Sequence, residues 1–263
     1  MANAKTDTGA VTVKKENTVV VPSFLEQDAN KGLEGMTQED LATPRLKVLM
    51  ALSPQINEIE GAKAGMIFNT ATDKLYDGSK GIKVLPCAYV RQYVEWQDRG
   101  QGTGAPVNVY GSNSDILTKT TRDNNNKDRL ENGNYIETCA NHFVIVVEDD
   151  GQFSPAVITM KSTQLKKSRK WNSIMNGLTL QGKNGSYSPP SFSRFYNLKT
   201  VLEGNDKGKW HGWDITAGEW ITEDQRSLYE KAMKFSESVR SGKETVKHEQ
   251  DDVKSNNSGD VPF

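Results

Sequence analysis

The sequence predicts a mainly β protein built on a partly open antiparallel barrel, with one helix inserted late in the chain and another near its C-terminal end. Several runs rich in Val, Ile, Tyr, Phe and Trp follow one another and are separated by polar turns. Helices do not alternate with strands as they would in a parallel α/β fold. No repeat of fixed period is present.

Length and composition define the expected domains. The chain has 263 residues, a formal net charge of −1 and 35% hydrophobic residues. This low apolar content predicts a modest core flanked by polar tails. We expect a flexible arm over residues 1–35, one binding domain over 36–240 and a disordered acidic tail over 241–263.

The expected compartment is the cytoplasm. No apolar run is long enough to cross a bilayer, and the N-terminus lacks the apolar stretch of a signal peptide. Cys87 and Cys139 are too few for a disulfide framework or a zinc cluster.

The N-terminal half contains most of the short elements. Thr37 and Asp40 predict a capped helical turn, and residues 44–52 predict either a strand or a short helix. Residues 65–78 read as a hairpin. Residues 81–96 form the longest predicted strand, in which Pro86 marks a bulge or an edge. Polar loops are expected over 98–106 and 122–134.

The C-terminal half is predicted to hold two hairpins and two helices. Residues 134–163 form a hairpin around Asp149, Asp150 and Gly151, because Asp-Gly is a strong turn signal. A helix over 163–178 follows, capped by Ser162 or Thr163. Residues 191–204 and 209–220 pair as the second hairpin. The last helix covers 222–240 and starts from Thr222 as N-cap.

Catalytic motifs do not stand out. The glycine-rich loop at 100–104 leads into a strand rather than a helix, so it does not form a dinucleotide site. His142, His211 and His248 are widely separated, unlike the ligands of a metal centre. Asp149 and Asp150 could hold Mg²⁺ in a nuclease, but a solvated hairpin turn explains them better. We therefore expect a non-enzymatic protein with no cofactor and no metal.

Cations and a large ring gather at residues 161–173. Cations suit phosphates, whose counterions are released on binding, and flat rings suit unpaired bases. An amphipathic helix with a basic polar side and a core tryptophan is the alternative. The candidate nucleic-acid-binding residues of this segment are Lys161, Lys166, Lys167, Arg169, Lys170 and Trp171.

Two predicted strands combine rings with arginines. Alternation places Tyr89, Arg91 and Tyr93 on one face of the strand at 81–96, and Arg194 and Tyr196 on one face of the strand at 191–204. Such faces could stack bases, or their rings could fill the core of the barrel. We take all five residues as candidates for nucleic-acid binding.

The chain ends in an acidic segment with a terminal ring. Asp260, Val261, Pro262 and Phe263 close it, and this Gly-Asp-Val-Pro-Phe ending resembles the Asp-Asp-Ile-Pro-Phe tip of bacterial single-stranded-DNA-binding proteins. Here a single Asp stands at the tip. The body of the chain contains the segments "TPRLKVLMALSP" and "KSTQLKKSRKWNS". With these segments it is similar to a phage-encoded single-stranded-DNA-binding protein.

The resemblance implies a function and partners. It implies an OB-fold that coats single-stranded DNA in phage DNA replication, recombination and repair, in the host cytoplasm. The tail would recruit replication or repair proteins. No membrane partner is expected. Monomer and dimer both remain open, as does DNA against RNA. The alternative function is a structural or interaction protein of a virion or replisome without intrinsic DNA affinity.

Overall fold

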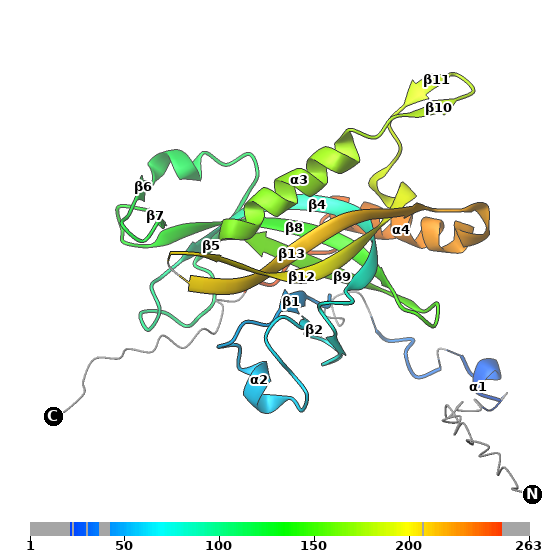
Figure 1. Ribbon diagram of the computed structural model, residues 1–263, viewed down its shortest axis with the longest axis horizontal. Coiled ribbons are helices and arrows are strands. Elements are labelled where there is room, and N and C mark those ends of the chain that lie inside the picture. Colours follow the sequence, from blue (N-terminus) through cyan, green and yellow to red (C-terminus); the bar gives the residue numbers. More distant parts are fainter. Residues whose placement is uncertain (1–21, 23, 30, 37–42, 207, 249–263) are drawn as a thin grey trace, which may run out of the picture. The chain divides into compact units, whose positions relative to one another are not determined.

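A computed structural model describes residues 22, 24–29, 31–36, 43–206 and 208–248 of the chain (Figure 1). The chain divides into two compact units, Met1–Leu41 and Ala42–Phe263. In the first unit the described part contains a short helix, α1 (Phe24–Gln27). The capped turn expected at 37–40, most of the expected arm and the acidic tip at 260–263 lie outside the described residues.

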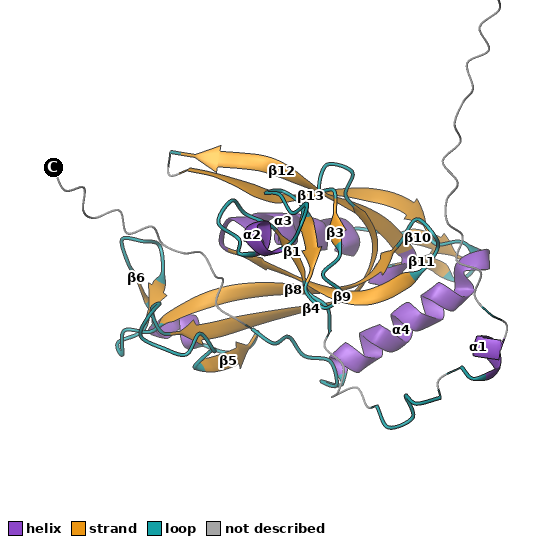
Figure 2. Cartoon of the chain, turned by 90° about the horizontal axis from the view of Figure 1, so that it is seen from below, coloured by secondary structure: helices purple, strands orange, loops and turns teal. Residues whose placement is uncertain are grey.

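The second unit is built on a large antiparallel sheet that curls on itself (Figure 2). Strands β13, β12, β4 and β8 are neighbours in that order, and β9 and β7 also pair with β8. This confirms the predicted mainly β class and the partly open, OB-like antiparallel barrel with added helices. The strands are β4 (Ile82–Trp96), β5 (Asn108–Gly111), β6 (Thr121–Arg122), β7 (Asp128–Arg129), β8 (Tyr135–Val147), β9 (Phe153–Lys161), β12 (Arg194–Asn205) and β13 (Gly208–Trp220).

A small sheet lies across the opening of this curl. It consists of β1 (Leu46–Val48), β2 (Ile67–Asn69) and β3 (Leu75–Tyr76), with the short helix α2 (Gln55–Glu58) between β1 and β2. The amide of Val157 in β9 donates to the carbonyl of Pro44 at 2.8 Å, and the amide of Thr200 in β12 donates to Gly78 at 2.8 Å. The small sheet therefore connects the two sides of the curl.

The two main helices occupy the predicted places. Thr222 and Gln225 form a capping box, which confirms the predicted N-cap of the last helix. The cap expected from Ser162 or Thr163 is wrong, because both residues lie within a 3₁₀ turn and neither side chain caps α3. The remaining elements are η2 (Ile116–Lys119), η3 (Ser162–Gln164), α3 (Leu165–Asn176), β10 (Leu180–Gly182), β11 (Gly185–Tyr187), η4 (Ser191–Ser193), η5 (Glu223–Gln225) and α4 (Arg226–Arg240).

The two main helices cover opposite faces of the sheet. Trp171 of α3 packs in the main core with Val84, whereas Ala232 of α4 packs with Leu85. Since successive strand residues point to opposite faces, α3 and α4 lie on different sides of β4. The register of β4 on β8 shifts at Pro86, which confirms the predicted bulge.

Residues 241–248 pack against the domain, although their polar composition places them in the predicted disordered tail. The hydroxyl of Thr43 donates to Glu244 at 2.6 Å, and His248 lies 2.9 Å from the side-chain oxygen of Gln92. Val246 also contacts the cluster around Phe143. These long-range contacts are not visible in local composition. Within the described residues, no helix has the length and apolar character that spanning a membrane requires.

Candidate nucleic-acid interface

A pocket of about 350 Å³ lies where the small sheet meets the large one. Its walls come from β1, the end of β9, η3, the start of β13 and the segment ending at His248. Three cationic residues line it, namely Arg45, Lys47 and Lys161. Glu137 is the one acidic residue among the described residues of its wall. The pocket therefore carries an excess of positive charge, which suits an anionic ligand.

The charges around the pocket are held in place by neighbours. Lys161 Nζ lies 2.8 Å from Glu137 Oε2, and the indole N–H of Trp96 donates to the same carboxylate at 3.2 Å. Burial, together with the positive charges of Lys161 and Arg45, lowers the pKa of His248 to about 4. His248 is therefore neutral at pH 7. The electrostatic potential at its imidazole is positive because Lys161 and Arg45 are close.

Two partly exposed rings form part of the pocket wall. The indole N–H of Trp210 donates to Glu203 Oε2 at 3.2 Å. The imidazole of His211 lies against Gly65, since a Cβ added at that glycine would stand 2.7 Å from the ring. Both contacts restrict the ring orientations, and the rings lie among the pocket cations. Flat rings beside cations are what single-stranded nucleic acid requires.

Helix α3 continues the basic surface away from the pocket. Its preceding turn, η3, lines the pocket, and the side chain of Gln164 accepts from the amide of Trp213 at 2.9 Å. Lys167 is half-buried and lies 2.8 Å from Glu203. The exposed cations of the helix are Lys166, Arg169 and Lys170. These three remain available at the surface for phosphates.

Three of the predicted aromatic candidates are core residues, which corrects the expectation that they form a stacking face. Trp171 and Tyr196 are each 0% exposed and Tyr93 is 7% exposed. Trp171 packs edge-on against Tyr196 with ring centroids 5.6 Å apart. Trp171 and Tyr196 are enclosed between α3 and the curled sheet, whereas Tyr93 packs in a separate cluster with Ile116 and Ile136.

Tyr89 and Arg91 are exposed and lie on the same side of the sheet as α3. The ring of Tyr89 lies 5.0 Å from that of His142, which stacks on Trp171 of α3 at 4.5 Å. Hydrogen bonding and charge interaction with Tyr89, together with Tyr93, raise the pKa of Arg91. The structure thus brings Tyr89 and Arg91 together with the basic helix.

Arg194 is not part of this group. Its Nε donates to the carbonyl of Gly218 at 2.8 Å, and its guanidinium lies 5.2 Å from the ring of Trp220. It pairs with Trp220 at the opposite end of the β12–β13 hairpin from Trp210. Arg194 therefore lies far along the hairpin from the pocket.

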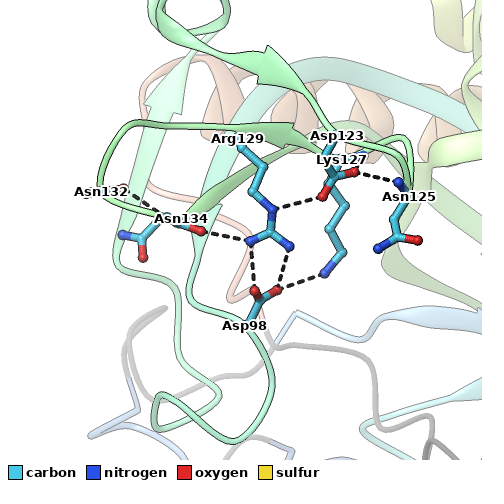
Figure 3. Close-up of polar contacts among 8 residues, drawn as sticks. Asp98, Asp123, Asn125, Lys127, Arg129, Asn132 and Asn134 are labelled. Atoms are coloured by element: carbon cyan, nitrogen blue, oxygen red, sulfur yellow. Dashed lines mark hydrogen bonds and ion pairs between the residues drawn. The ribbon is translucent and has the colours of Figure 1, made fainter.

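A second concentration of charge lies beyond the end of β4 (Figure 3). Asp98 accepts from Arg129 through both carboxylate oxygens, at 2.8 and 3.1 Å, and from Lys127 at 3.0 Å. Asp123 accepts from Arg129 at 2.9 Å and from the amides of Asn125 and Lys127. Both carboxylates are already engaged by cations of the protein, and their arrangement fixes the loop between β6 and β7.

Sequence reasoning missed several pocket residues. Arg45 and Lys47 alternate around Leu46, which is the spacing of one strand face, and Trp210 and His211 lie within a Lys-Trp-His-Gly-Trp run. Both patterns combine cations or rings with β periodicity. The sequence of neither segment indicates that the two lie side by side in the fold, because their proximity depends on the packing of β1 between β9 and β13.

No curated protein and no solved structure matches the chain. A family model described as Pam3 phage gp34-like protein matches residues 14–245, which is most of the chain and includes every described wall of the pocket except His248. The chain belongs to the Pam3 phage gp34-like protein family.

Proposed function

We propose that this phage protein binds single-stranded DNA without sequence preference and coats it during phage DNA replication and recombination. The observation that carries the proposal is the pocket at the junction of the two sheets. It places Arg45, Lys47 and Lys161 beside the rings of Trp210 and His211, with only Glu137 as an acid among its described wall residues. The proposed activity is non-enzymatic and takes place in the host cytoplasm.

In the proposed complex, cations of the protein bind the phosphates of the strand and aromatic rings stack on its bases. Phosphates approach the pocket cations and the exposed cations of α3, and the release of their counterions drives association. Bases stack on Trp210, His211 and Tyr89, because every base has a flat face. Such contacts do not read the hydrogen-bonding edges of bases, so the affinity depends little on sequence.

The acidic ending supports a recruiting role within the same proposal. Asp260 would pair with a basic site on a replication or repair protein, while the Phe263 ring fills an apolar pocket there. The described chain ends at His248, which lines the proposed DNA pocket. Fifteen further residues follow it in the sequence.

The proposal is tested with pocket variants of the full-length protein and a labelled oligo-dT. Lys47→Ala and Trp210→Ala should each weaken binding about 5- to 10-fold, since one phosphate contact or one stacked ring is lost. Lys234→Ala is the matched control, because Lys234 is an exposed lysine of α4, on the opposite face of the sheet. Equal affinities for all three variants and the wild type would contradict the proposed site.

Removing residues 249–263 tests the tail separately. Binding to oligo-dT should persist or tighten, because the deletion removes acidic residues, while co-purification of replication proteins from infected cells should be lost. A protein that never binds DNA but keeps a tail-dependent partner would instead be a structural or interaction protein of a virion or replisome.

A further inference from the structure

The β10–β11 hairpin stands off the C-terminal end of α3 (Figure 1). Among the described strands, β10 and β11 pair only with each other, in the register Leu180 to Tyr187 and Gly182 to Gly185. Each residue of β11 is exposed. A hairpin that lies outside the main sheet does little for its core, so its side chains are available for another role.

Tyr187 is held on this hairpin with half of its surface open. The side chain is 50% exposed. A Cβ added at Gly182 would lie 3.2 Å from two carbon atoms of the Tyr187 ring, so the ring lies across that glycine. On the other face of the hairpin, Gln181 donates to the hydroxyl of Ser186 at 2.7 Å. The ring is therefore supported from one side and open to a flat ligand on the other.

The charge around the hairpin favours a polyanion. No Asp or Glu occurs in the sequence from Gly151 to Leu202. Lys183 lies in the hairpin turn, and the exposed Lys166, Arg169 and Lys170 lie on the helix that leads to it. An acid-free surface that combines lysines with an open ring has the two features that a single strand requires.

We propose that the β10–β11 hairpin is a second contact for single-stranded nucleic acid, in which Tyr187 stacks on a base and Lys183 binds a phosphate. This rests on the proposed function. The 12 residues of α3 span about 18 Å. At about 3.4 Å per stacked nucleotide, roughly five nucleotides span the length of α3, and the strand would continue from there to the hairpin.

Binding of full-length variants to a labelled oligo-dT of about 20 nucleotides tests the hairpin, because one OB fold covers roughly 4–16 nucleotides. Tyr187→Ala should bind about 10-fold more weakly, while Tyr187→Phe keeps the ring and should bind within about 2-fold of the wild type. Lys183→Ala should reduce the slope of log affinity against log salt by about 0.7. Ser186→Ala is the matched control, since it breaks the Gln181 hydrogen bond and leaves the ring.

A second readout uses the unchanged protein. Irradiation of a complex with 5-iodouracil-containing oligonucleotide should crosslink Tyr187, and the adduct can be located by mass spectrometry. If the wild type does not bind oligo-dT, the proposed function fails. If the wild type binds but Tyr187→Ala binds equally well and no crosslink forms at Tyr187, only the second contact is overturned. An equal loss in Ser186→Ala would also overturn it, because the hairpin fold rather than the ring would then carry the effect.

Discussion

Acidification should destabilise the protein through a buried histidine. His142 is 1% exposed, stacks on Trp171 and lies 2.8 Å from the hydroxyl of Ser168. Burial lowers the pKa of His142 to about 3, whereas an unperturbed histidine titrates near 6.5. The unfolded chain therefore binds a proton at this residue before the folded chain does.

The sign and size of the effect follow from this difference. A lowered pKa means that the stabilising contribution is complete above about pH 6.5 and falls as the pH decreases toward the folded-state value. At pH 5 the solution is about 1.5 units below the unfolded pKa, and each unit corresponds to about 1.4 kcal/mol. Protonation of the unfolded chain at His142 should therefore cost the fold about 2 kcal/mol at pH 5.

His248 should add a similar loss over the same interval, because its pKa is lowered to about 4. Replacing His142 by Asn, which does not titrate, should remove about half of the histidine-linked loss. Urea unfolding followed by tryptophan fluorescence at pH 7.5 and pH 5 measures this loss within each variant, so the lower absolute stability of the variant cancels.

The reasoning is refuted if His142→Asn and the wild type lose the same free energy of unfolding between the two pH values. A second measurement needs no variant. The nuclear magnetic resonance signal of the His142 ring should stay at its neutral position down to pH 5, and a midpoint near pH 6.5 would contradict the burial argument.

Three further predictions concern the pocket wall, the basic helix and the charged loop. Gly65→Ala should lower stability by about 1–3 kcal/mol more than Gly61→Ala, because both glycines have positive φ but only at Gly65 does a Cβ meet the His211 ring; equal urea midpoints would contradict that contact. Replacing three helix cations with alanine should reduce the slope of log affinity against log salt by about 2, and an unchanged slope would exclude α3 from the interface. These cations are Lys166, Arg169 and Lys170. Arg129→Lys should lower the free energy of unfolding by about 1–3 kcal/mol, since lysine cannot reproduce the two-point contact with Asp98 (Figure 3). Thermal unfolding at low and at high salt measures this loss. A variant as stable as the wild type at both salt concentrations would contradict the prediction.

Much of the fold could be predicted because its signals are local. The Asp-Gly turn at Gly151 joins β8 and β9, and the capping box at Thr222 starts the last helix. Each of these signals involves residues within a few positions of one another, so the chemistry of the turn or cap specifies the structure. The bulge at Pro86 is predictable for the same reason.

The candidate site could be predicted only in part because it depends on long-range packing. Alternation correctly places Tyr89 and Tyr93 on one face of β4, but it does not show that the loop around Ile116 covers Tyr93 while Tyr89 stays exposed. The pocket joins Arg45, Lys161 and Trp210, which are far apart in the chain. Their proximity results from β1 packing between the two sides of the curled sheet.

The most direct test of the central claim is the affinity of the full-length protein for three labelled ligands across a salt series. Fluorescence anisotropy with oligo-dT, the matching RNA and a duplex would be measured in parallel. We predict that single-stranded DNA binds more tightly than duplex, with a slope of log affinity against log salt of about −2 or steeper, from three or more phosphate contacts at about −0.7 each. Absence of binding, a salt-independent affinity or a preference for duplex would contradict the proposed function.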